Sequence, residues 1–266
     1  MKIREITDAI EQYAPLRLQE EWDNAGIQVG DPEADISGVL LCTDATEAVV
    51  AEAIERGFNL VIAHHPLIFR GLKKIMGRTP VERAVAMAIK HDITIYSAHT
   101  NMDSAWQGVS FRMADKIGMT NVVFLDDNPV DPYGEQESTS AGGGVIGDIE
   151  PMEAREVLQR VKAAFEVGAV RYCGDANRIV TRVALCGGAG GFLLDKAVNM
   201  GAQLYVTADM RYHDFLDNWQ RIVVADIGLY ESEHFTKEIF LEIIQKKNPT
   251  FAVDFAKKET NQVNYL

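Results

Sequence analysis

The chain has 266 residues, of which 47% are hydrophobic and 24% charged, so it can bury a full core as one large or two small globular domains. A net charge of −13 argues against a surface built for nucleic-acid phosphates or anionic membranes, and it is compatible with cation binding. The three cysteines lack a C-x-x-C spacing, and we find neither a signal-like amino terminus nor an apolar run of membrane-spanning length, so we expect a reduced, cytoplasmic protein.

The first part of the chain alternates helical and strand patterns. Ile3, Ile6 and Ile10 recur at helical spacing, and Pro15 ends the predicted helix. The elements expected next are a turn and strand within residues 22–30, a buried strand over residues 39–42, and a helix that starts after residues 43–46 and stops at Gly57. This alternation is typical of an α/β protein.

Two adjacent histidines follow the next buried strand. Residues 60–63 are apolar and predict a strand buried on both faces, which ends in His64, His65 and Pro66 because proline cannot donate to a sheet ladder. In the plain structural interpretation, one histidine caps a loop and the other faces solvent. We favour a metal site, because ligand sites gather at the carboxyl ends of strands in open α/β sheets.

A second polar tip follows the next predicted strand. Residues 67–79 form a basic, glycine-containing connection that fits a plain surface loop or a mobile flap. A helix over residues 81–90 and a strand over residues 93–96 are expected after it. This strand leads into a polar segment that holds His99 and Asp103, and a further helix closes the first half.

The second half opens on a segment with few apolar residues. Residues 126–144 are rich in Asp, Pro, Ser and Gly, which predicts a linker or an exposed loop. Residues 144–147 and 169–172 then predict strands that flank a helix beginning at Pro151.

An internal repeat relates the two halves. The strand pattern at residues 183–186 repeats that at residues 39–42, an offset of 144 residues. The same offset relates Gly201 to Gly57, and the predicted strand end at Ala208 to that at His64. A chance likeness between two βαβ units is the alternative, since such lengths are common. We interpret the pattern as a duplication that gives two α/β halves with mixed sheets flanked by helices, divided as residues 1–125 and 126–266.

Imidazoles and carboxylates from separate strand ends form the candidate site. His64, His65, Asp103 and Glu233 offer the ligand types that suit Zn, Mn, Fe or Ni. Either carboxylate could instead be a solvated charge or a helix cap. His99 is a candidate general acid or base, or a residue that supports a ligand, and a purely structural histidine is the alternative.

A glycine-rich turn lies between a predicted strand and helix in the second half. Its sequence is Gly187-Gly188-Ala189-Gly190-Gly191. Backbone N–H groups of such a turn can cradle phosphate, but the spacing matches neither the dinucleotide fingerprint nor the P-loop. Close helix packing or a tight turn is the alternative.

The chain carries five motifs in a fixed order: Trp22-Asp23-Asn24-x-Gly26, Ala63-His64-His65-Pro66, His99-Thr100-Asn101-x-Asp103, the glycine-rich turn, and Tyr230-Glu231-Ser232-Glu233. Together they resemble the motifs of the Nif-three-like dinuclear-metal-centre proteins, often labelled GTP cyclohydrolase 1 type 2 homologues. The resemblance covers nearly the whole chain, in the short form without an inserted domain. It implies two interlocked α/β domains, two divalent metal ions and commonly a homohexameric ring. By resemblance His64, His65, Asp103 and Glu233 are ligands, with Glu233 bridging.

One position departs from the family pattern. Members usually carry a histidine four residues before the bridging glutamate, and in this chain that position is Leu229. Leucine cannot coordinate a metal, so we expect one weakly held ion unless water, His213, His99 or His234 substitutes.

The function that these residues favour is metal-dependent hydrolysis. We expect a small nucleotide-like or phosphorylated substrate, attack by water on carbon or phosphorus, and proton transfer by Glu233 or His99. GTP as the substrate is only what the family label suggests. The alternative is a non-catalytic metal-binding or regulatory interaction protein, which Leu229 favours. Binding of DNA or RNA conflicts with the acidic composition.

Overall fold

A computed structural model describes residues 1–127 and 141–266 of the chain, which divide into two compact units. Unit 1 consists of Met1–Met102 and His234–Gln262, and unit 2 of Asp103–Glu233 and Val263–Leu266. This division differs from the expected one at residues 125 and 126, because helix α10 (Thr236–Lys247) packs with the first helix and with strands of unit 1. Each unit is therefore built from two separate segments of the chain.

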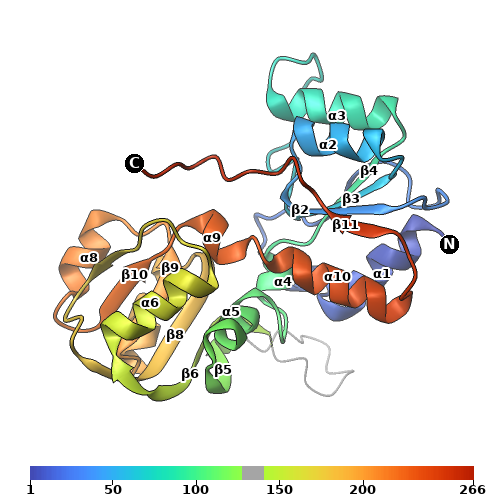
Figure 1. Cartoon of the computed structure of the whole chain (residues 1–266). Coiled ribbons are helices and arrows are strands. Elements are labelled where there is room, and N and C mark those ends of the chain that lie inside the picture. Colours follow the sequence, from blue (N-terminus) through green and yellow to red (C-terminus); the bar gives the residue numbers. More distant parts are fainter. Residues whose placement is uncertain (128–140) are drawn as a thin grey trace. The chain divides into compact units, whose positions relative to one another are not determined.

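The sheet of unit 1 has five strands, with three parallel strands at its centre (Figure 1). Its order is β1 (Gly26–Val29), β4 (Thr94–Ser97), β3 (Leu60–His65), β2 (Val39–Asp44) and β11 (Val253–Phe255). Only β1 runs antiparallel to its neighbour. The residues of β2, β3 and β4 are almost all buried, as expected for parallel strands covered on both faces.

Helices cover both faces of this sheet. On one face lie α2 (Glu47–Glu55) and α3 (Pro80–Lys90), and on the other α1 (Ile3–Tyr13) and α10 (Figure 1). Thr46 and Thr79 cap the first pair, each accepting a hydrogen bond from a first-turn amide. A short 3₁₀ turn (Leu16–Leu18) follows α1, and the helix α4 (Thr100–Asp103) follows β4 at the polar segment that holds His99.

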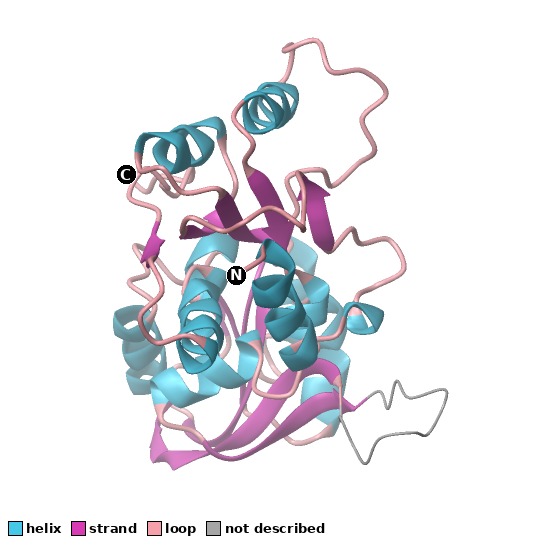
Figure 2. Ribbon diagram, turned by 90° about the vertical axis from the view of Figure 1, so that its right-hand side faces the viewer, coloured by secondary structure: helices cyan, strands magenta, loops and turns pink. Residues whose placement is uncertain are grey.

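The sheet of unit 2 has six strands, again with three parallel strands in succession (Figure 1). Its order is β5 (Thr120–Asp127), β6 (Gly142–Glu153), β8 (Ile179–Ala189), β9 (Leu204–Ala208), β10 (Val223–Asp226) and β7 (Arg171–Cys173). Its helices are α5 (Val109–Ile117), α6 (Ala154–Ala164), the 3₁₀ turn Gly191–Leu193, α7 (Leu194–Asn199), α8 (Tyr212–Asn218) and α9 (Leu229–Glu233). The mixed α/β class and the two mixed sheets flanked by helices are confirmed (Figure 2).

The offset of 144 residues recurs in the strand register. In unit 1 Val39 pairs with Leu60, and in unit 2 Val183 pairs with Leu204, so both partners are displaced by the same number. In each sheet the third parallel strand is flanked by an antiparallel edge strand, β1 or β7. The two sheets therefore share one plan, as the repeat predicts.

Two sequence expectations are corrected in unit 2. The helix predicted from Pro151 begins at Ala154 instead, because Met152 still pairs with Val180 and the strand β6 runs on through the proline. Of the expected linker at residues 126–144, the two ends are strand residues of β5 and β6, and residues 128–140 lie outside the described residues. No helix among the described residues has both the length and the apolar character needed to cross a membrane.

Candidate metal centre

The strand β3 carries both histidines of the pair into one cluster of rings. His64 is fully buried and His65 is partly exposed, and their ring centroids lie 4.9 Å apart. The ring of His99, which follows β4, lies 5.4 Å from that of His64 and 5.5 Å from that of His65. Adjacent parallel strands end at the same edge of the sheet, so the three imidazoles form one three-histidine cluster.

Each imidazole of the cluster is held through its Nδ1 atom. His64 Nδ1 lies 2.8 Å from the carbonyl oxygen of Ala98, and since a carbonyl only accepts, this nitrogen carries the proton. His65 Nδ1 lies 2.9 Å from Oδ1 of Asp44. In all three rings the partner is an oxygen acceptor, which leaves the lone pair on Nε2. This is the arrangement typical of histidines that ligate a metal through Nε2.

His99 is oriented by Asp23, a residue of the motif at residues 22–26 to which the sequence assigned no role at the site. His99 Nδ1 donates to Asp23 Oδ1 over 2.8 Å, and the hydroxyl of Thr100 donates to Oδ2 of the same carboxylate. Burial raises the pKa of Asp23, but the hydrogen bonds from His99 and Thr100 outweigh this effect and lower the pKa to about 2. Asp23 is therefore an anion throughout the neutral range, and its carboxylate holds the ring of His99 through Nδ1.

Asp44 has the same relation to His65. It is the last residue of β2 and the register partner of His65 on β3, whereas the sequence pattern placed it only in the segment 43–46 that precedes a predicted helix. The signal that could have found it is its position at the end of a strand parallel to that of the histidine pair, since adjacent strand ends lie about 5 Å apart.

Glu233 ends α9 and is almost fully buried. Gly188 packs against it with a φ of +66°, and a Cβ atom at this position would overlap Oε1 of Glu233. The amide of Gly188 donates to Oγ of Ser232 over 3.0 Å, and that hydroxyl donates to the carbonyl of Leu229 over 2.8 Å. The glycine thus provides the space that the carboxylate occupies.

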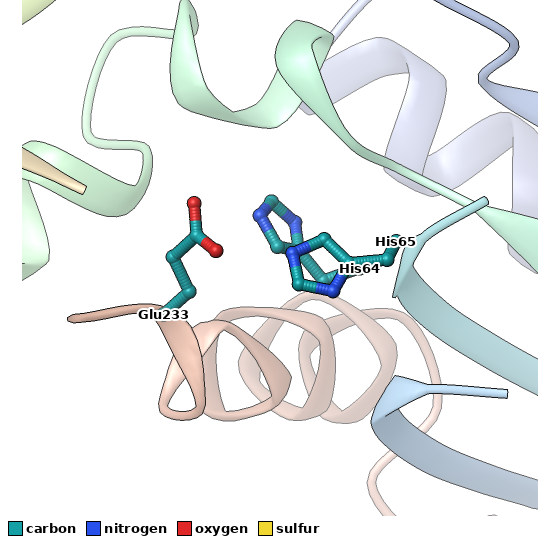
Figure 3. Close-up of side chains that lie close together, drawn as sticks. All are labelled: His64, His65 and Glu233. Atoms are coloured by element: carbon teal, nitrogen blue, oxygen red, sulfur yellow. The ribbon is translucent and has the colours of Figure 1, made fainter. Parts of the chain in front are cut away.

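The ligand atoms of His64, His65 and Glu233 all lie within 4.8 Å of one another. Figure 3 shows the carboxylate of Glu233 directed toward the two imidazoles. Two neutral nitrogens and one carboxylate form a donor set that suits Zn, Mn, Fe or Ni. The set fits a divalent ion, because the Nδ1 bonds fix which nitrogens offer lone pairs and Gly188 leaves room for the carboxylate.

Asp103 does not belong to this three-residue group. It is the last residue of α4, and its charge acts on the buried thiol of Cys186. Burial is the main cause that raises the pKa of Cys186 to about 12, and the charges of Asp103 and Glu233 add to it. The role of Asp103 as a ligand stays a prediction.

The glycine-rich turn serves packing in this structure. The amide of Gly187 donates to Oγ of Ser110, and that of Gly190 donates to Oγ1 of Thr207. A Cβ atom on Gly190 would overlap Thr207 and the hydroxyl of Tyr205. Because these amides already have protein acceptors, the structure favours close packing over a phosphate cradle.

Leu229 is the first residue of α9 and lies one helical turn before Glu233. Residues four apart share a helix face, so a histidine at this position would lie on the same face as the carboxylate. Of the side chains considered as substitutes, His213 is exposed on α8, whereas His99 belongs to the three-histidine cluster.

Comparison with known proteins identifies the family of the chain and its structural relatives. The family model DUF34/NIF3 (NGG1p interacting factor 3) matches residues 1–262. A protein of Clostridium perfringens named GTP cyclohydrolase 1 type 2 homolog is 36% identical and is aligned over 88% of this chain and 87% of its own length. A protein of the same name from Streptococcus pneumoniae is 31% identical over the full length of both chains. The crystal structure of Staphylococcus aureus protein SA1388 matches with a TM-score of 0.91 and 27% identity, over 100% of this chain and 99% of that one.

Proposed function

We propose that this chain, which belongs to the DUF34/NIF3 family, is a divalent-metal-dependent hydrolase of a small nucleotide-like or phosphorylated substrate. The observation that carries the proposal is the three-histidine cluster, in which every Nδ1 faces an oxygen acceptor and two of the rings lie with Glu233 in one ligand group. Such fixed rings favour metal binding over a purely structural role.

The proposed ligands are His64, His65, Asp103 and Glu233, for up to two divalent ions. When bound, such an ion acts as a Lewis acid and lowers the pKa of water. His64 and His65 offer Nε2, and Asp44 keeps His65 in that tautomer. Glu233 offers a carboxylate that lies in the space left by the missing Cβ atom of Gly188.

His99 and Glu233 are the proposed groups for proton transfer. His99 can take a proton from the attacking water on Nε2, since its Nδ1 proton is already donated to Asp23. The resulting imidazolium is stabilised by the Asp23 carboxylate, and it can then protonate the leaving group. The carboxylate of Glu233 is the alternative acceptor of that single proton, and it would return the proton to the leaving group in place of His99.

A panel of substrates tests the proposal. Purified protein loaded with Zn²⁺, Mn²⁺ or Fe²⁺ should turn over at least one member of a set of nucleotides, phosphodiesters and cyclic amides. His65→Ala should abolish that turnover. The control is His91→Ala, which removes an exposed histidine at the carboxyl end of α3 and should leave the turnover unchanged. Full activity of His65→Ala would exclude the proposed site.

Leu229 favours a second candidate function, a non-catalytic metal-binding or regulatory protein. A leucine in place of the usual histidine removes one nitrogen ligand next to Glu233. Stoichiometric metal binding with no turnover across the panel would favour this alternative.

We also propose a homohexameric ring and a cytoplasmic location. The ring is what the family resemblance implies, and the location is supported by the three cysteines, which are all free thiols. Sedimentation velocity of the purified protein tests the ring, since a monomer of 29.5 kDa and a hexamer differ sixfold in mass.

A further inference from the structure

Two aromatic rings beside the three-histidine cluster are exposed. Trp22 is 58% exposed and Phe69 is 49% exposed, and their ring centroids lie 5.7 Å apart. Both rings also contact His99, at 6.0 Å from Trp22 and 6.2 Å from Phe69. Aromatic side chains with free ring surface next to a reactive group provide a stacking surface for planar rings.

The segments that carry these two rings are tied together. The amide group of the Asn24 side chain donates to the carbonyl of Ile68 over 2.7 Å. The amide of Ile68 in turn donates to Oε1 of Gln28 over 3.2 Å. These bonds join the turn after Trp22 to the residue before Phe69, so the stacking surface is formed before any ligand arrives.

A group of cations follows Phe69 directly. Arg70, Lys73 and Lys74 are exposed, and none of them makes an ion pair or a side-chain hydrogen bond within the described part of the chain. By contrast, Arg83 on α3 forms a two-pronged pair with Glu47. In a chain with a net charge of −13, three cations without an ion pair within five residues give this segment a local positive charge that can attract an anion.

We infer that the ligand of this centre is a planar heteroaromatic ring that bears a phosphate or a similar anionic group. The ring would stack on Trp22 and Phe69, and the anion would be bound by Arg70, Lys73 and Lys74. This inference rests on the proposed function for the position of the reacting bond beside His99. It narrows the proposed substrates to molecules that combine a planar ring with an anionic group. A ring alone would leave the cations unused, and an anion alone would leave the stacking surface unused.

Equilibrium binding measured by calorimetry tests the inference without any turnover. The probes are GMP and AMP, ribose 5-phosphate, which lacks the ring, and guanosine, which lacks the phosphate. Each is titrated into the full-length protein with Mn²⁺ and again with a chelator. We expect the nucleotides to bind more tightly than ribose 5-phosphate by roughly five- to 150-fold, the contribution of one stacked base.

Variants separate the two features. Trp22→Leu should reduce the affinity for GMP to that for ribose 5-phosphate, whereas Trp22→Phe should retain most of it. Trp219→Leu, which removes a tryptophan that is 52% exposed on unit 2, is the matched control and should bind GMP like the wild type.

The cations are tested separately. The double variant Lys73→Gln and Lys74→Gln should weaken the binding of GMP but not that of guanosine. The control double variant Lys90→Gln and Lys246→Gln, which removes two other exposed lysines, should change neither affinity.

Two results would overturn the inference. They are equal affinities for GMP and ribose 5-phosphate, and an unchanged affinity for GMP in Trp22→Leu. If the protein nevertheless hydrolyses a non-aromatic phosphate, the proposed hydrolase function is supported and only the inferred ligand class is wrong. If GMP binds tightly and this binding depends on Trp22, but no substrate is turned over, the ligand class is supported and the hydrolase function is wrong.

Discussion

The Nδ1 atom of His65 lies 2.9 Å from Oδ1 of Asp44, its register partner on the neighbouring strand. Asp44 and His65 are 21 positions apart in the sequence, and the parallel pairing of β2 and β3 places their side chains next to each other. The bond selects the tautomer with its proton on Nδ1, and it raises the basicity of the nitrogen that remains. This relationship makes Asp44 a positioning residue for the proposed metal centre.

Asp44→Ala should weaken metal binding about 10- to 100-fold, the usual effect of losing the partner of a ligating histidine. Zn²⁺ affinity measured with a competing chelator checks this. Asp217→Ala, which removes an exposed carboxylate from α8, is the control and should bind as the wild type does. An unchanged affinity in Asp44→Ala would mean that His65 is not a ligand or is held by other means.

Leu229→His should increase the number of tightly bound ions. The new imidazole would lie one turn before Glu233, on the same helix face, and would add a nitrogen donor. After dialysis against a weak chelator, elemental analysis should find more metal per chain in the variant than in the wild type. Val123→His places a histidine at an exposed position of β5 instead and should show no gain. Two firmly held equivalents in the wild type, with no increase in Leu229→His, would contradict the expectation.

Gly188→Ala should disturb the Glu233 carboxylate. The added Cβ atom would overlap Oε1, and the positive φ of +66° adds backbone strain, for a total loss of stability of about 1–3 kcal/mol. The matched control is Gly201→Ala, where φ is +80° but no atom lies within 4 Å of the added Cβ. Both variants should lose some stability in urea denaturation, and only Gly188→Ala should also lose metal affinity. Equal metal binding in the two variants would argue against Gly188 as the support of Glu233.

Asp23 should make the stability depend on pH in the acid range. Its pKa is about 2 in the folded protein and near the ordinary value of 3.8 in the unfolded chain. Between these values the unfolded chain binds more protons, so about 2 kcal/mol of stabilisation is complete above pH 4 and is lost as the pH falls toward 2.

Urea denaturation of the wild type and of Asp23→Asn at a series of pH values isolates this contribution, because the other carboxylates are common to both proteins. The difference in unfolding free energy should shrink as the pH is lowered from 5 to 2.5. A difference that stays constant over this range would show that the Asp23 carboxylate is not stabilised by His99 and Thr100.

Much of the fold and part of the site could be predicted from local sequence patterns. The apolar runs at residues 39–42 and 60–63 became the buried strands β2 and β3, and the offset of 144 reappears as an identical strand register in the second sheet. The histidine pair at a strand end is also a local feature, because the end of an apolar run and a following proline are both visible in the chain. Local patterns determine such features since they depend on neighbours within a few residues.

Only the tertiary structure decided which distant groups act together. That Asp23 and Asp44 hold His99 and His65, and that Gly188 leaves room for Glu233, depends on strand register and on packing between segments far apart in the sequence. Long-range packing also decides that residues 234–262 belong to unit 1. Likewise, Pro151 lies in a strand and not at the start of a helix, because Met152 pairs with Val180 of β8. Sequence alone therefore determined the elements and the reactive side chains, whereas long-range pairing determined their orientation.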